Sequence, residues 1–286
     1  MNREFRRILL EKLASGPLTS LVEGKINKPK GSNFTSLFAA MPPGPAREKL
    51  VLDELIRRGK PTNLVPITID GPKGTKITYK VMPDYVMIDG LRITMSPATA
   101  QMVADKFNMK LPTDKMSKQI YQAADTKIRA NPLSGTGYTG ADGKFYNKDE
   151  VAKKRINQSD AAIEYNKLTD QEIAKLKQTG KSPTLIAGHG KDILQPMSNS
   201  NDPSIGGWAG ASGRDLQPYG SPHKGQAKGH TEYGLYTRLI DDDAVITGPD
   251  GKVINVSLEK LLNNPNTAVS LTNKPGIQRY NIYNHF

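Results

Sequence analysis

The sequence predicts an α+β fold in which helices flank a mostly antiparallel sheet, with long glycine-rich loops in the C-terminal half. Strand-like alternation of apolar and polar residues runs through 64–95, and helical spacing of apolar residues precedes and follows it. Hydrophobic residues make up 36% of the 286 residues, which is enough for a sizeable core. We expect a single domain over 1–286, in which 1–60 is a helical N-terminal extension and 182–286 bears the functional site.

Helices are expected near both ends of the N-terminal extension. Apolar residues recur at helical spacing in 4–14 and again in 45–58, where the pattern ends before Gly59. The Gly/Pro/Ser-rich segment 24–44 between them is expected to be a connector. Both helices are predicted to pack against the rest of the domain.

A β-meander is predicted over 64–95. Its strands are LVPITI, TKITYKVM, PDYVMIDG and LRITM, and the sequence GPKG supplies the first turn. A helix pair follows over 97–128, in which Ser96 caps the first helix, Thr113 caps the second and 109–112 joins them.

The rest of the chain alternates between regular and irregular segments. The polar segment 147–179 is predicted to be helical, with Thr169 and Gly180 capping its last part. The segment 195–234 has almost no apolar periodicity, and long irregular loops of this kind are usually functional or disordered. Strands are predicted over 234–240 and 244–247, with a charged turn at 241–243 between them. GPDG joins the second strand to a strand over 252–256, and the helix LEKLLNN follows.

The chain is strongly basic. It contains 40 Lys and Arg residues against 28 Asp and Glu residues, which gives a formal net charge of +12. This charge favours encounters with polyanions such as nucleic acid, anionic lipid or an acidic cell wall. No apolar run is long enough to predict a membrane span. The absence of Cys excludes thiolate nucleophiles and Cys-ligated metal sites.

Histidines are concentrated in the last hundred residues: His189, His223, His230 and His285. A glycine-rich aperiodic segment lets such side chains converge on a ligand. Imidazole and carboxylate groups form the usual shell of a catalytic zinc, which lowers the pKa of a bound water.

Two chemistries are open at this cluster. In a zinc version, Glu232 is the base, and Lys191 or Arg238 stabilises the oxyanion. The zinc is then held by the three histidines nearest the C-terminus: His223, His230 and His285. In a metal-free version without any cofactor, His189 paired with Asp192 is the base and Glu232 is the acid.

The segment SPHKGQAKGH, Ser221 to His230, resembles the S-x-H-x-x-G-x-A-x-D motif of the D-alanyl-D-alanine zinc carboxypeptidase family. His223 matches the histidine ligand of that motif, and His230 stands where the family has its aspartate ligand. The terminal His285 is similar to the final histidine ligand of the family, although no glutamate base precedes it. This resemblance implies a zinc-dependent hydrolase of peptidoglycan.

A broader similarity covers about residues 90–265 and includes AGHGKD, LQP and the H…EY…RL pattern. This part of the chain resembles a group of uncharacterised bacterial proteins, many of them secreted, that share these motifs. The polar and aromatic positions that match are His189, Lys191, Asp192, Trp208, Gln217, His223, Glu232, Tyr233 and Arg238. The resemblance therefore supports one domain without naming a reaction.

Aromatic residues in the glycine-rich segment suggest a substrate. Trp208 and Tyr219 are candidates for stacking on a sugar, or they pack in the core, and Gln217 lies between them in the sequence. We therefore expect a bacterial or phage hydrolase of a cell-wall polymer, with peptidoglycan as the substrate, that is secreted or associated with a virion.

Two alternatives from other classes remain. The helix pair over 97–128 is also compatible with a helix-turn-helix that binds nucleic acid, with Lys115 and Lys118 facing the duplex. Otherwise the same pair packs in the core. The second alternative is a non-enzymatic structural protein of a phage or cell surface, in which the histidine cluster is incidental.

Overall fold

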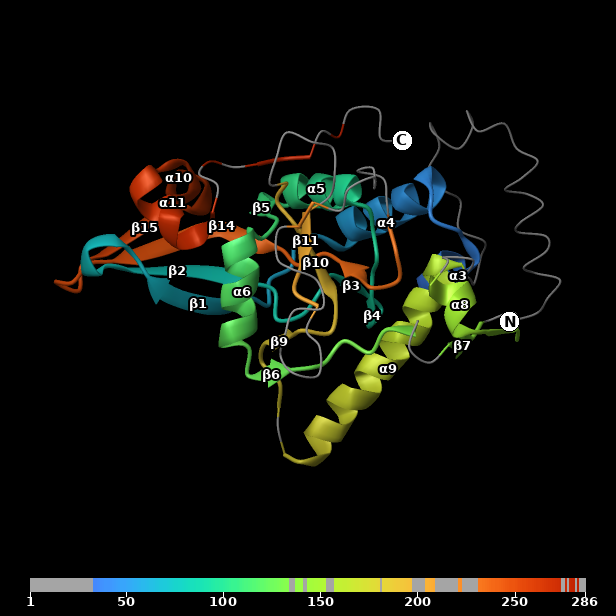
Figure 1. Ribbon diagram of the computed structural model, residues 1–286. Coiled ribbons are helices and arrows are strands. Elements are labelled where there is room, and N and C mark those ends of the chain that lie inside the picture. Colours follow the sequence, from blue (N-terminus) through green and yellow to red (C-terminus); the bar gives the residue numbers. More distant parts are fainter. Residues whose placement is uncertain are drawn as a thin grey trace.

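The computed structural model confirms the α+β class, with mostly antiparallel sheets (Figure 1). The structure describes residues 33–133, 137–140, 143–152, 157–180, 182–196, 204–208, 221–222, 231–273, 276, 278–280 and 282. The expected helix at 4–14 lies outside this part of the chain.

The helices are α3 (Phe34–Ala40), α4 (Pro45–Arg58), the short 3-10 helix η1 (Pro72–Gly74), α5 (Pro97–Lys106), α6 (Asp114–Ala123), α8 (Lys148–Ala152), α9 (Gln158–Gln178), α10 (Leu258–Asn263) and α11 (Pro265–Leu271). The strands are β1 (Val65–Asp70), β2 (Lys76–Val81), β3 (Met87–Ile88), β4 (Leu91–Arg92), β5 (Met109–Lys110), β6 (Thr126–Lys127), β7 (Tyr138–Thr139), β8 (Phe145–Tyr146), β9 (Ile186–Ala187), β10 (Lys191–Leu194), β11 (Ser204–Gly206), β12 (Ser221–Pro222), β13 (Leu235–Tyr236), β14 (Ile240–Thr247) and β15 (Val253–Ser257).

The larger sheet has the order β1-β2-β14-β15, with β5 beside β14, and all its pairs are antiparallel. The β1–β2 and β14–β15 hairpins confirm the strands predicted on either side of the GPKG and GPDG turns. The turn predicted at 241–243 was wrong, because β14 runs through these residues. The continuous meander over 64–95 was wrong, because within the described residues β3 and β4 pair with each other and not with β2. Strand β14 takes the place beside β2, where Ile240 and Ala244 complete a buried face with Ile77 and Tyr79.

A smaller sheet has the order β12-β11-β10-β13 and lies at the centre of the molecule (Figure 1). Strand β10 pairs antiparallel with β11 and parallel with β13. The β6–β9 pair is parallel and leads into the segment before β10. Strand β10 is therefore flanked by β11 and β13 within the smaller sheet.

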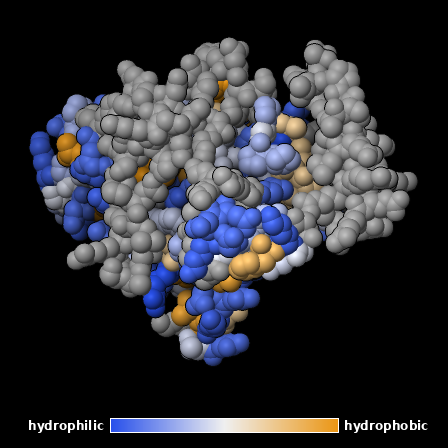
Figure 2. Space-filling view, turned by 45° about the vertical axis from the view of Figure 1, so that its right-hand side comes forward, coloured by the Kyte–Doolittle hydropathy of each residue, from blue (hydrophilic) through white to orange (hydrophobic). Residues whose placement is uncertain are grey.

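The described surface is mostly hydrophilic in the view of Figure 2, with small hydrophobic areas. None of the helices in the described part of the chain is long and apolar enough to cross a membrane.

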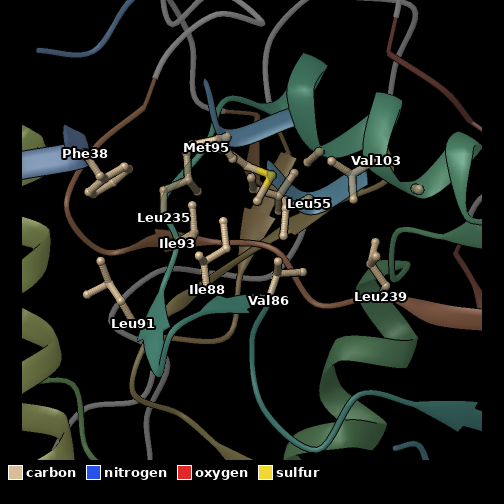
Figure 3. Packing of buried hydrophobic residues seen from close by; sticks show 14 of the residues in the cluster. Phe38, Leu55, Val86, Ile88, Leu91, Ile93, Met95, Val103, Leu235 and Leu239 are labelled. Atoms are coloured by element: carbon tan, nitrogen blue, oxygen red, sulfur yellow. The ribbon is translucent and has the colours of Figure 1, made fainter. Parts of the chain in front are cut away.

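The main hydrophobic core lies between the smaller sheet and the helices α3, α4 and α5, as the close-up of Figure 3 shows in part. Phe38 and Leu55 come from α3 and α4, and Ile88 and Ile93 come from the β3–β4 region. The described part of the N-terminal extension is thus packed into this core. The expected connector 24–44 contains α3, because Asn33 caps a short helix whose apolar side chains are buried there.

The predicted start of the helix pair is confirmed. The Ser96 hydroxyl accepts a hydrogen bond from the Thr99 amide, and the Thr113 hydroxyl accepts one from the Met116 amide. The second helix ends at Ala123 rather than near 128, because β6 leaves it to pair with β9.

The two helices do not form a helix-turn-helix. Strand β5 interrupts their connection, α5 packs in the main core, and α6 packs against the larger sheet through Met116 and Ile120. The Lys115 amine donates to Val269 O at 2.5 Å, and the Gln119 amide donates to Ser270 O at 2.8 Å. Helix α11 therefore covers part of the face that a recognition helix would turn toward DNA.

Helix α9 runs without a break through Thr169, so a cap at this residue was wrong. The Thr169 hydroxyl donates to Tyr165 O within the helix at 3.0 Å. Gly180 does follow the helix end, with a φ of +81° that favours glycine.

Candidate acid-base site beside strand β10

The candidate site is built around the sequence Gly188-His189-Gly190-Lys191-Asp192, which leads into β10. The Tyr85 hydroxyl donates to Gly190 O at 3.0 Å, and the Tyr165 hydroxyl donates to His189 O. Tyr85 stacks on Tyr236 with ring centroids 5.0 Å apart, and both rings lie against Gly190. The backbone at His189 is therefore held by buried tyrosines from three other segments.

His189 pairs with Asp84, which lies between β2 and β3. The distance from His189 Nε2 to Asp84 Oδ1 is 3.1 Å. Asp84 Oδ2 accepts hydrogen bonds from Arg92 Nε at 3.0 Å and Nη2 at 2.7 Å. Arg92 also donates to Asp170 on α9 at 2.7 Å. The hydrogen-bonded series Asp170–Arg92–Asp84 therefore fixes the orientation of the His189 imidazole through its Nε2 atom.

The two members of this pair have shifted pKa values. Burial lowers the pKa of His189, although Asp84 opposes the shift, and we infer a neutral imidazole. Burial alone would raise the pKa of Asp84, but His189 and Arg92 hold it well below its usual range. An ionised Asp84 favours the tautomer in which Nε2 carries the proton.

The other ring nitrogen of His189 is the unusual feature of the site. Its Nδ1 atom is buried and has no hydrogen-bond partner within the described part of the chain. A neutral imidazole that donates from Nε2 presents a basic lone pair at Nδ1. Leaving such an acceptor unpaired in a core costs free energy, so it calls for an explanation.

Asp192 is a second buried carboxyl of this segment, and His189 influences its pKa. Its Oδ2 accepts a hydrogen bond from the Ser117 hydroxyl on α6. Burial raises the pKa of Asp192, and Arg238 and Ser117 oppose this shift. Gly207 allows the close packing, because a Cβ there would lie 2.8 Å from Oδ2 and φ is +87°. The environments of Asp84 and Asp192 thus push their pKa values in opposite directions.

Arg238 lies over the Tyr85 ring, with its guanidinium carbon 4.7 Å from the centroid. Its Nη1 donates to Met82 O at 2.8 Å and its Nη2 to Ile186 O at 2.6 Å. Together with Ser117 and Asp192 it lines an enclosed hollow that is too narrow for a water molecule in this conformation. Binding of a substrate at Asp192 therefore requires this hollow to open.

Lys191 and Asp192 are consecutive in β10, so their side chains leave opposite sides of the strand. Lys191 forms a nearly buried ion pair with Glu232. Its amine also lies 4.3 Å from the centroid of the Trp208 ring, and the Trp208 indole N–H donates to Tyr165 at 3.0 Å. This second group faces α9, whereas Asp192 faces α6.

The structure changes several of the predicted roles. The pairing of His189 with Asp192 was wrong, since Asp84 takes that position. Trp208 is half-buried with Lys191 over its ring, and Tyr233 packs edge-on against Tyr165. The remaining predicted positions lie outside the described residues: Gln217, Tyr219, His223, His230 and His285. Within the described residues, no group of three or more His, Asp or Glu side chains could hold a metal ion.

Sequence reasoning missed the residues that hold the site from outside 182–286. These residues are Asp84, Tyr85, Arg92, Ser117 and Tyr165. The only local signal is the Pro-Asp-Tyr sequence directly after β2, where an acidic residue breaks the strand alternation.

No family model matches the chain, and neither a curated protein nor a solved structure shows significant similarity to it.

The lowered pKa of His189 predicts that acidification destabilises the fold. A group whose pKa is depressed by folding contributes stability above its unfolded value of about 6.5, and this contribution is lost as the pH falls through the folded value. We expect the urea midpoint to fall between about pH 7.5 and pH 5.5, and to fall less in His189→Gln. Equal pH slopes for both proteins would contradict a neutral buried His189.

Proposed function

We propose that the protein is a hydrolase of a cell-wall polymer, with His189 as general base and Asp192 as general acid. One observation carries this proposal: the buried imidazole of His189 is held by Asp84 at one nitrogen and has no partner at the other among the described residues. A carboxylate-oriented histidine with a free nitrogen is the arrangement that activates water or a hydroxyl group.

The reaction follows from the protonation states of the groups. His189 Nδ1 takes a proton from a water whose oxygen attacks the reacting carbon. A new carbon–oxygen bond forms, the bond to the leaving group breaks, and the leaving group takes the proton of Asp192. The raised pKa of Asp192 supports its role as donor, and the ionised Asp84 stabilises the imidazolium that forms. After product release, solvent water takes the proton from the His189 imidazolium and returns one to Asp192, which restores the starting protonation states.

The choice of substrate rests on the whole chain. A net charge of +12 favours an anionic polymer, and the cell wall is such a polymer. Glu232, expected earlier as the acid, is ion-paired with Lys191. The zinc version depends on His223, His230 and His285, which lie outside the described residues, so we derive no step through a metal.

The test is the release of soluble fragments from purified bacterial cell walls by the full chain, before and after treatment with a chelator. We expect release in both cases. Release that disappears with the chelator and returns with zinc would replace the acid-base proposal by the zinc version. No release from any wall preparation would overturn the hydrolase and favour a structural protein. Assays for new reducing ends and new amino groups then identify the cleaved bond.

A further inference from the structure

A cleft of about 400 Å³ lies between the segment that follows β6 and the C-terminal part of α9. Its lining residues are Lys127, Ile128, Arg129, Ala130, Asn131, Glu172 and Leu176. Its volume lies within the range of ligand-binding clefts, and its walls combine apolar side chains with charged ones.

The cleft carries positive charge that is not neutralised. Arg129 is exposed and makes no hydrogen bond or ion pair with any side chain that the structure describes. The Lys127 amine donates to Ala124 O at 2.9 Å and Gln122 O at 3.3 Å, which are uncharged partners. Glu172, the acidic residue among the described residues of the lining, is already paired with Lys175 at 2.7 Å. An anion in the cleft therefore meets Arg129 and Lys127 without displacing an ion pair.

The wall of the cleft is connected to the candidate site. The Ile128 amide donates to Ala187 O at 2.9 Å, two residues before His189. The Asn131 backbone lies close enough to the Tyr165 hydroxyl to influence its pKa, and this hydroxyl donates to His189 O. A polymer lying in this cleft is thus held against the segments that position the imidazole.

We infer that this cleft binds the anionic oxygens of an extended cell-wall polymer, with Arg129 as the principal contact and Lys127 beside it. The planar guanidinium matches the geometry of both phosphate and carboxylate groups. The choice of a wall polymer rests on the proposed function, whereas the anion site rests on the cleft itself. The contact then serves to hold the polymer while it is cleaved.

The test measures binding of the full-length His189→Gln protein to insoluble cell walls at several salt concentrations. Arg129→Glu is expected to weaken binding about tenfold at low salt. It is also expected to reduce the slope of log affinity against log salt concentration by about 1, the contribution of one ionic contact. The matched control is Lys252→Glu, which makes the same change of charge in the exposed turn of the β14–β15 hairpin and is expected to change binding less than about twofold. The same variants in the parent background, with soluble polyphosphate as probe, cover the case in which His189→Gln fails to fold.

Walls stripped of their phosphate polymers distinguish phosphate from carboxylate as the bound group. Equal losses in Arg129→Glu and Lys252→Glu would overturn the inference, because binding would then follow net charge alone. Stronger, Arg129-dependent binding of duplex DNA than of walls would also overturn it, in favour of a nucleic acid. Because binding needs no turnover, a parent that binds walls through Arg129 but does not cleave them would refute the proposed hydrolase and leave the anion site standing.

Discussion

Replacement of His189 by Gln is expected to lower the rate of wall hydrolysis about 10²- to 10⁴-fold, the usual contribution of a general base. Glutamine can still donate an amide hydrogen to Asp84, but it has no basic nitrogen to take the proton of water. The measurement is the initial rate of fragment release, normalised to the folded fraction from urea unfolding. A variant that is folded and fully active would remove His189 from the mechanism.

Asp84→Asn tests the same group without changing the imidazole. It is expected to reduce the rate by a comparable factor, because an amide does not stabilise the imidazolium or select its tautomer. Asp170→Asn is the matched control, since Asp170 also pairs with Arg92 at 2.7 Å but its side chain is 57% exposed. We expect this control to retain nearly the parental rate. Similar losses of rate in Asp84→Asn and Asp170→Asn would mean that the two carboxylates act by holding Arg92 in place, and not through the contact of Asp84 with His189.

Gly190→Ala is expected to reduce the free energy of unfolding by about 3 kcal/mol, at the upper end of typical overpacking costs. A Cβ at this position would overlap the Tyr236 ring and lie 2.8 Å from Tyr85 Cε2. Both rings are almost fully buried and stacked on each other, so neither can move away without disturbing the core. The free energy is measured by urea unfolding followed by circular dichroism.

The matched control for this prediction is Gly234→Ala, at another glycine near β13. A Cβ there would lie 3.8 Å from the Trp208 ring, which is an ordinary contact. We expect its free energy of unfolding to stay within about 1 kcal/mol of the parent, because Gly-to-Ala exchanges at unstrained positions stabilise by about 0.4–1 kcal/mol. If Gly190→Ala were as stable as Gly234→Ala, the tyrosine stack would not be packed against the backbone of His189 as described.

The candidate site was only partly predictable from the sequence. Composition and motif pointed to His189 and Asp192, and both are buried in one electrostatic group. The partner of His189 is Asp84, which is 105 residues away in the sequence. Several carboxylates are equally available by composition, and only the packing of the segment after β2 against β10 selects one. The buried tyrosines and Ser117 belong to elements whose apolar patterns predicted core packing alone.

Local sequence patterns were sufficient to predict the elements whose signals act within a few residues. The Ser96 and Thr113 caps, helix α4 and the β1–β2 and β14–β15 hairpins all form where local pattern and turn residues agree. Only long-range packing explains why β14 pairs with β2, and why α6 ends at Ala123 so that β6 can pair with β9. Both outcomes depend on contacts between segments that are far apart in the sequence: which apolar faces pack together and which strand edges pair. Local sequence patterns do not specify such contacts.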